Sequence, residues 1–171
     1  MADVEQRESY HANGKLKIKA GYVEGELHGN WVEYLETGEL RKEGTYRGGL
    51  MDGKWIVYHP HGNAEFEGEY RNGQKHGRWV GYHDSGELRY EGVFADNRCE
   101  GKWVEYYRNG AVKEEKNYKG GQLDGKWVYV DEGGQVRGEG TFVGGNGEWT
   151  EYDLDGRMTK VRTYREGVGS G

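Results

Sequence analysis

Tryptophan recurs along this chain at a fixed interval. Five tryptophans follow one another every 24 residues and the sixth comes 22 residues after the fifth: Trp31, Trp55, Trp79, Trp103, Trp127 and Trp149. A glycine stands two positions before each tryptophan and another stands seven positions after it. A fixed period of about 20 to 50 residues is the signature of a repeat architecture, in which each unit packs mainly on its neighbours. We therefore expect a single repeat domain over residues 1–171.

Each period has the composition of a β-hairpin. Two short segments rich in Trp, Val, Ile, Tyr and Thr flank an x-Gly pair such as Thr37–Gly38. These residue types favour strands, and the x-Gly pair predicts a type I′ turn, which needs positive φ at both central residues. Glycine recurs too often for helices. The expected fold is all-β, without helices: a twisted, elongated, single-layer antiparallel meander of about 14 strands made of 24-residue β-hairpin repeats.

The period also sets the expected boundaries of the units. They are a flexible N-terminus at 1–9, a partial first repeat at 10–29, full repeats at 30–53, 54–77, 78–101, 102–125 and 126–147, a terminal partial repeat at 148–167, and a tail at 168–171 that resembles an added linker. Longer polar segments such as 71–77 are expected to connect one hairpin to the next.

The register of a two-residue turn assigns side chains to the two faces of the sheet. With Thr37–Gly38 as the turn, Leu35 pairs with Leu40 and Trp31 lies opposite Gly44, which leaves room for the indole. The six tryptophans then form a structural aromatic column on one face. The other face carries a tyrosine column, the predicted partner-binding residues: Tyr34, Tyr58, Tyr82 and Tyr106. Tyrosine offers a large contact area at low entropic cost, so burial of the tryptophans would make the tyrosine face the binding surface.

Two departures from the period carry structural predictions. Lys116 occupies the position that is glycine at 44, 68, 92 and 140, so its side chain is expected over or beside Trp103. The connection at 142–149 is two residues short, so the last hairpin is expected to sit at an altered angle or to end the regular stack.

Composition narrows the possible functions. The net charge of −6 is spread in mixed sign, which disfavours nucleic acid and membrane lipid as main partners. The six histidines, including His59 and His61, lack a regular set of ligands around them, and Cys99 has no activating base beside it. We therefore expect no catalytic residue, no metal and no cofactor. With no long apolar run and no apolar leader, the expected location is cytoplasmic.

The stretch YRNGQKHGRWVGYHDSGELRYEGVF resembles the MORN (membrane occupation and recognition nexus) repeat, and most closely its variant with the pattern G-x-W-x-x-Y. The likeness extends over residues 10–167. The resemblance implies a stack of β-hairpins used as a scaffold, sometimes dimeric, in some cases with a groove for a helix or peptide. Some bacterial relatives are described as antitoxins.

These observations favour a non-enzymatic repeat scaffold that binds another protein, as a peptide or helix, along an aromatic sheet face. Three alternatives remain: a carbohydrate or cell-wall type binding module, a phosphoinositide or membrane-surface binder, and an antitoxin-like partner protein. Open edge strands also allow a homodimer, since unpaired edges invite association.

Overall fold

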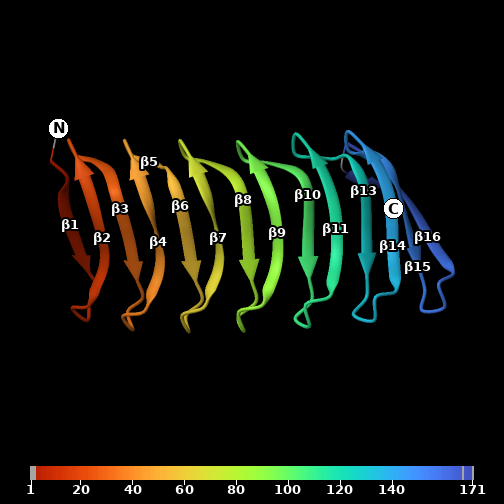
Figure 1. The fold of residues 1–171 in the computed structure, drawn as a ribbon, viewed down its shortest axis with the longest axis horizontal. Helices are drawn as coiled ribbons and strands as arrows, with labels where there is room; N and C mark the ends of the chain where they lie inside the picture. Colours follow the sequence, from red (N-terminus) through yellow and green to blue (C-terminus); the bar gives the residue numbers. More distant parts are fainter. Residues whose placement is uncertain (1–2, 167, 171) are drawn as a thin grey trace. The chain divides into compact units, whose positions relative to one another are not determined.

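A computed structural model describes residues 3–166 and 168–170 of the chain. In this part of the chain every regular element is a strand and the strands form one antiparallel sheet, which confirms the predicted all-β meander (Figure 1). The strands are β1 (Glu5–Tyr10), β2 (Leu16–Val23), β3 (Glu26–Tyr34), β4 (Leu40–Arg47), β5 (Leu50–Met51), β6 (Gly53–Tyr58), β7 (Ala64–Arg71), β8 (Gln74–Tyr82), β9 (Leu88–Ala95), β10 (Arg98–Tyr106), β11 (Val112–Lys119), β12 (Gln122–Leu123), β13 (Gly125–Val130), β14 (Val136–Val143), β15 (Asn146–Tyr152), β16 (Met158–Arg165) and β17 (Val168–Ser170).

Strands extend further toward both ends of the chain than we expected. Most of the stretch predicted to be a flexible N-terminus belongs to β1, which pairs with β2 from Glu5 opposite Tyr22 to Tyr10 opposite Leu16. The predicted tail contains β17, which pairs with β16 through residues 163–165; Gly171 lies outside the described residues. Both segments are polar, but their backbone groups gain ladder hydrogen bonds whatever their side chains are.

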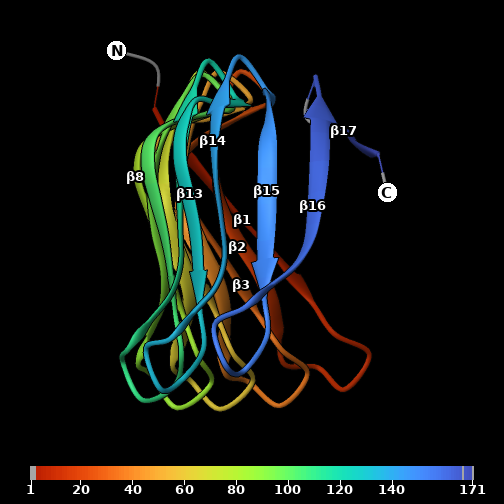
Figure 2. The ribbon, with the colours of Figure 1, turned by 90° about the vertical axis from the view of Figure 1, so that its right-hand side faces the viewer.

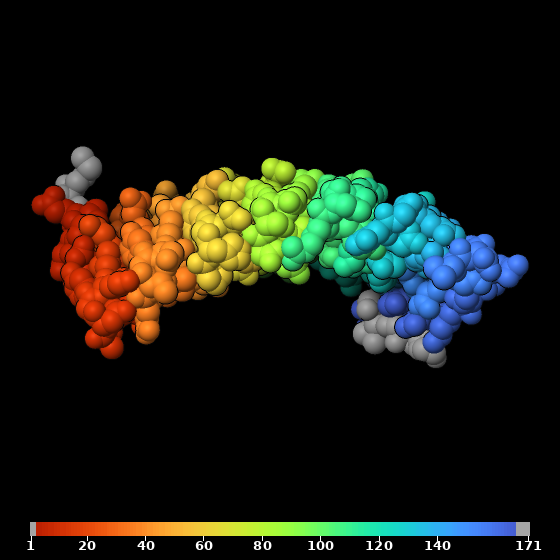
Figure 3. All heavy atoms as spheres, turned by 90° about the horizontal axis from the view of Figure 1, so that it is seen from below, coloured from red at the N-terminus to blue at the C-terminus, as the bar shows by residue number. Residues whose placement is uncertain are grey.

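The contacts of the chain divide it into two compact units, residues 1–86 and 87–171. The first contains β1 to β8 and the second β9 to β17. Within each unit, consecutive strands pair with one another along the chain. Figure 3 shows the atoms of successive repeats within each unit in direct contact, as expected of a solenoid-like stack.

The type I′ turns lie between consecutive hairpins, at the opposite end of the strands from the x-Gly pairs where we predicted them. At the x-Gly pairs only the glycine has positive φ, as at Gly38 (104°). Gly38 donates to Leu35 O and Leu35 N donates to Glu39 O, both at 2.9 Å. This is a three-residue loop closed by a left-handed glycine. The loop is residues 36–38, closed by Leu35 and Glu39, and Leu40 pairs with Tyr34, so the predicted pairing of Leu35 with Leu40 is wrong.

The segments predicted to be long connectors contain the two-residue turns. Both central residues have positive φ at Asn72 (49°) and Gly73 (77°), and the flanking Arg71 and Gln74 are paired. The same holds at Glu24–Gly25, Gly48–Gly49, Asp96–Asn97, Gly120–Gly121 and Gly144–Gly145. Except for Leu50, the residues that follow these turns are polar, and they can start the next strand because a strand at this position needs only backbone pairing.

The pairing of tryptophan with glycine in each hairpin is nevertheless as predicted. Trp31 lies opposite Gly44, and Trp55 lies opposite Gly68. In the second unit Trp127 lies opposite Gly140. The bulge that closes the loop shifts the register only after Glu33, so the strand beyond it keeps the expected partners.

A second bulge explains the glycine two positions before each tryptophan. Gly29, Gly53, Gly77, Gly101 and Gly125 all have positive φ, and the pairing with the preceding strand is irregular around each of them. The shortened connection lacks this device, since β14 and β15 pair without any register shift and Gly147 does not have positive φ. Bulges bend strands, and Figure 2 shows β15 as a nearly straight strand. The missing two residues therefore remove a bend from the last hairpin.

Candidate functional site

Each indole on the tryptophan face packs on the hairpin that precedes it. A Cβ added to Gly44 would lie 2.3 Å from the Trp55 ring, and one added to Gly68 would lie 2.2 Å from the Trp79 ring. Gly92 receives Trp103 at 2.0 Å in the same way, whereas Trp149, after the shortened connection, lies 2.0 Å from a Cβ added to Gly138, which pairs with Tyr129 and not with a tryptophan. The glycine opposite a tryptophan in its own hairpin therefore makes room chiefly for the indole of the next repeat.

Hydrogen bonds and aromatic contacts complete this packing in the first unit. The indole nitrogens of Trp55 and Trp79 each donate at 3.2 Å to a backbone carbonyl of the preceding hairpin, on Thr45 and Glu69. Tyr46 meets Trp55 edge to face at 5.2 Å between centroids. Trp55 is 5% exposed and Trp79 is 2% exposed. The tryptophan face thus supplies the hydrophobic core of this unit, which is the structural role expected of the column.

Lys116 breaks the column in the second unit, but against a different tryptophan from the one we predicted. Its strand position is opposite Trp103, yet its Nζ lies 4.9 Å from the Trp127 ring centroid and 2.7 Å from a Glu114 carboxylate oxygen. The Trp127 indole donates to that carboxylate at 2.7 Å instead of to a backbone carbonyl. We predicted the wrong tryptophan because the position of Lys116, like that of Gly44, receives the indole of the next hairpin. A side chain at this position displaces that indole.

The predicted binding tyrosines lie on the other face, half-buried, with most of their hydroxyls occupied. Tyr58 donates to Glu43 at 2.6 Å, Tyr82 to Glu67 at 3.0 Å, and Tyr106 to Glu91 at 2.8 Å. Each acceptor belongs to the preceding hairpin. Tyr34 differs, since the recorded contact is of its backbone carbonyl with His11 Nε2 at 2.9 Å. The structure brings Tyr34, Tyr58 and Tyr82 into successive repeats of the first unit and Tyr106 into the second.

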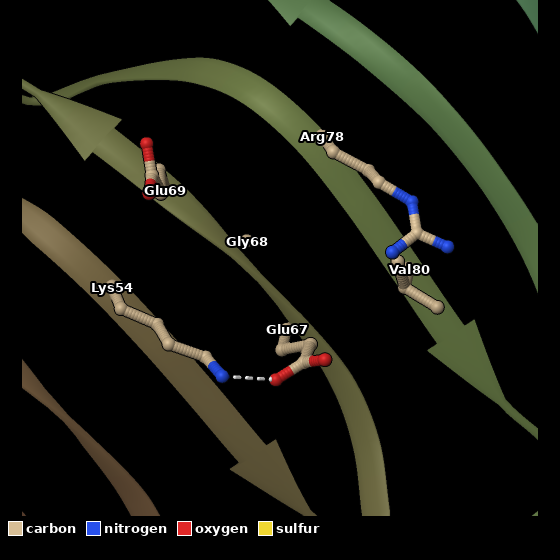
Figure 4. Close-up of a pocket in the computed structure, with 6 residues that line it drawn as sticks. All are labelled: Lys54, Glu67, Gly68, Glu69, Arg78 and Val80. Carbon is tan, nitrogen blue, oxygen red and sulfur yellow. Dashed lines mark ion pairs between the residues drawn. The ribbon is translucent and has the colours of Figure 1, made fainter.

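Lysine side chains pair with carboxylates of the same row. Lys54 pairs with Glu67 at 2.6 Å (Figure 4), and Lys102 pairs with Glu115 at 2.6 Å. Lys126 lies 3.8 Å from Glu139, which also accepts from Tyr152 at 3.0 Å. Our sequence reasoning missed this glutamate row. It was visible as a glutamate every 24 residues from Glu43 to Glu139.

These contacts change the acidities of the groups involved. The Lys54 ammonium is the main cause that lowers the pKa of Glu67, and Tyr82 acts in the same direction while burial opposes both. Burial is the main cause that raises the pKa of Tyr58 to about 12, and the hydrogen bond to Glu43 adds to it. Tyr58 is therefore neutral and Glu67 ionised near neutral pH.

Shallow hollows lie between these rows in the first unit. One, of about 280 Å³, is lined by Lys54, Glu67, Gly68, Glu69, Arg78 and Val80 (Figure 4). A second, of about 270 Å³, has Val32 and Ile56 in its floor. Val80 is only 4% exposed. The tyrosine face thus combines an aliphatic floor, aromatic ring surfaces and paired charges, which is the composition of a binding platform with a partly apolar centre.

Residues 3–166 and 168–170 contain neither a metal-binding cluster nor a membrane-spanning helix. In that part of the chain no three or more His, Cys, Asp and Glu side chains gather closely enough to hold a metal ion. The rings of His59 and His61 stack 5.4 Å apart, and His61 Nε2 lies 2.9 Å from the Asp84 carbonyl. No helix within the described ranges has the length and apolar character to cross a membrane.

Stacked hairpins that pack by indole on glycine define a repeat scaffold. The family described as "MORN repeat variant" matches residues 6–24, 27–47, 51–72, 75–96 and 100–119, and the chain belongs to this family. The regular stack continues in the structure beyond residue 119, although the family match ends there.

Comparisons with individual proteins add little. No curated protein matches the chain. A crystal structure of a protein with unknown function from Bacteroides fragilis is 8% identical, with 94% of this chain and 91% of that chain covered, at a TM-score of 0.18. A similarity at that score carries no argument about fold or function.

Proposed function

We propose that the chain is a non-enzymatic scaffold that binds a peptide or helix of another protein along its tyrosine face. The observation that supports this most is the burial of Trp55 and Trp79. Because the tryptophan face is used as the core of the first unit, the tyrosine face is the one that its repeats leave for a partner.

The chemistry of the tyrosine face suits a protein partner. Its tyrosine rings and the half-buried Val32 and Ile56 offer area to apolar side chains, while the exposed Lys54, Lys102 and Lys126 offer charge in three of the repeats. The hydroxyls of Tyr58, Tyr82 and Tyr106 are already bonded to glutamates, so these rings are held in place before a partner arrives. Pre-organised rings lose little side-chain entropy on binding.

The same features weigh against the alternatives. Sugar-binding modules need exposed aromatic platforms, whereas Trp55 and Trp79 are covered. A phosphoinositide or anionic membrane surface needs an excess of cations, whereas the lysines here are paired with glutamates. An antitoxin-like role is a special case of the proposal, with a toxin as the partner. We place the chain in the cytoplasm on the expectation from its sequence.

Photo-crosslinking tests the choice of face. A photoreactive amino acid at position 54 or 126 probes the tyrosine face, and one at position 42 or 160 probes the tryptophan face, since Lys42 pairs with Glu33 and Lys160 with Glu151. We expect one discrete protein adduct, identified by mass spectrometry, from positions 54 and 126 only. The same adduct from positions 42 and 160 alone would mean that the partner binds the tryptophan face, and would refute the proposal.

Charge reversal tests the energetic contribution of that face. The variant Lys54→Glu/Lys126→Glu should weaken binding of the crosslinked protein by about tenfold, because two interface charges are reversed. The variant Lys42→Glu/Lys160→Glu makes the same change in net charge on the other face and should leave binding unchanged. Equal loss from both variants would mean that only net charge matters and would refute a face-specific interaction.

A further inference from the structure

Both ends of the stack carry an arginine at the position where a further repeat would dock. In the regular repeats the residue paired with a hairpin's own tryptophan receives the indole of the next hairpin, as Gly44 receives Trp55 and Gly68 receives Trp79. In the last hairpin the residue paired with Trp149 is Arg162. An indole arriving there would meet a guanidinium side chain instead of a bare backbone.

At the N-terminal edge the tryptophan of this indole–glycine contact is replaced by an arginine. Arg7 pairs with Ala20 in β1 and β2, and it stands 24 residues before Trp31, so it occupies the tryptophan position of the first hairpin. Its guanidinium lies 4.5 Å from the Tyr22 ring centroid and donates two hydrogen bonds to the Glu5 carboxylate at 2.9 and 2.8 Å. Arg7 therefore covers the end of the aromatic column and presents a charge outward.

Two positions elsewhere in the chain show what the indole-receiving position tolerates. Ala20 holds a single methyl group there, is 1% exposed and still lies opposite Trp31. Lys116 holds a long cationic side chain there, and the Trp127 indole is redirected to the Glu114 carboxylate. Arg162 is as long and as charged as Lys116, and one of its nitrogens is engaged with Glu151 at 2.9 Å. It is thus expected to exclude an indole in the regular position.

Apart from these arginines the two ends would fit each other. β1 has six residues, as does β6, the strand that docks in the regular stack. β17 pairs with residues 163–165 of β16 and leaves residues 158–162 without a recorded outer partner among the described residues. Unpaired edges are templates for association, and natural sheets block them with charged side chains.

We propose that Arg7 and Arg162 are end caps that prevent copies of this chain from stacking head to tail. In such a stack Arg7 of one copy would be placed on Arg162 of the next, where the regular repeats place an indole on a glycine. Two guanidinium groups, each paired with a carboxylate of its own copy, would lose water in the place of a hydrophobic contact. A homodimer through the open edges, which the sequence allowed, is disfavoured by this pair, and the faces remain as the surfaces for interaction.

Mixing two single variants tests the caps without requiring either to polymerise. Arg7→Trp restores the indole at the N-terminal edge, and Arg162→Gly restores the glycine at the C-terminal edge. We expect each variant alone to have the wild-type mass in analytical ultracentrifugation, and an equimolar mixture to form a one-to-one complex that grows no further. Arg7→Trp/Arg162→Gly in one chain should form open-ended oligomers whose mean mass rises with concentration.

Two outcomes would overturn the proposal. The first is a mixture that stays at the wild-type mass although both variants keep the wild-type circular dichroism spectrum. The second is open-ended association of the wild-type chain itself. As a control, Arg157→Trp is mixed with Lys160→Gly. These variants also introduce a tryptophan and a glycine, but at exposed positions of the last hairpin that are not capping positions. The mixture should give no complex.

Discussion

Gly68→Ala is the substitution that most sharply tests the packing of indole on glycine. The added Cβ would lie 2.2 Å from Trp79 Cδ2 and 2.3 Å from Cε2, whereas carbon atoms in contact are about 3.5 to 4.0 Å apart. Trp79 is 2% exposed, so the ring must move by more than 1 Å, roughly the difference between these distances, into space that is already filled. Overpacking of this kind costs about 1–3 kcal/mol.

The movement also costs a hydrogen bond. Trp79 Nε1 donates to the Glu69 carbonyl at 3.2 Å, and loss of such a bond in a buried place costs about 1 kcal/mol. Alanine returns about 0.4–1 kcal/mol by restricting the unfolded chain. The net expectation is a loss of roughly 2–3 kcal/mol in the free energy of unfolding, measured by urea titration with tryptophan fluorescence and circular dichroism.

Gly133→Ala is the matched control for this prediction. Gly133 has no positive φ, is exposed, and would bring its new Cβ no closer than 3.3 Å to the Asp131 carboxylate. We expect a change within about 0.5 kcal/mol. The reasoning is refuted if Gly68→Ala is no less stable than Gly133→Ala and its tryptophan emission maximum does not shift.

Three further predictions concern the polar groups. Tyr58→Phe should lower the free energy of unfolding in urea by about 1–2 kcal/mol, because the bond to Glu43 at 2.6 Å is lost. Tyr10→Phe removes an exposed bond to Glu8 and should lower it by almost nothing. Equal losses would contradict a structural role for the tyrosine row. Burial raises the pKa of Tyr58 and of Tyr118 to about 12, above about 10 in an unfolded chain, so the folded state holds these protons more tightly. Their contribution to stability is complete below about pH 10 and is lost as the pH rises toward 12; unfolding free energy that stays constant over this range would be the contrary result. Lys116→Met should lower the free energy of unfolding by about 1–2 kcal/mol, because Glu114 loses its partner at 2.7 Å. Lys116→Met/Glu114→Met should recover part of that loss. A double variant less stable than the single one would contradict the pairing.

The hairpin architecture was predictable from the sequence because it depends on short-range patterns. The 24-residue period, the strand-forming residues between glycines and the pairing of Trp31 with Gly44 all follow from local spacing. The turn types were exchanged, because an x-Gly pair fits either a type I′ turn or a three-residue loop with left-handed glycine. The structure distinguishes them, because Gly38 but not Thr37 has positive φ and Gly38 donates to Leu35 O.

Contacts between hairpins were harder to predict than contacts within them. Local spacing does not show that the Trp55 indole lies on Gly44 of the preceding hairpin, because that depends on the bulge at Gly53, which shifts one strand against the next. The position of Lys116 against Trp127 was mistaken for the same reason. The faces were predictable from parity, but the occupation of the tyrosine hydroxyls by glutamates fifteen residues earlier was not, since it again joins neighbouring hairpins.

Binding along the tyrosine face requires that the tryptophan face is the core and that the tyrosine face is free for a partner. Hydroxyl-radical footprinting of the free chain, read residue by residue by mass spectrometry, measures this directly. We predict that Trp55 and Trp79, at 5% and 2% exposure, are oxidised much more slowly than Tyr10 at 58%, although the indole is intrinsically the more reactive ring. Oxidation of Trp55 and Trp79 at or above the rate of Tyr10 would show that the tryptophan face is open, and would contradict the choice of the tyrosine face.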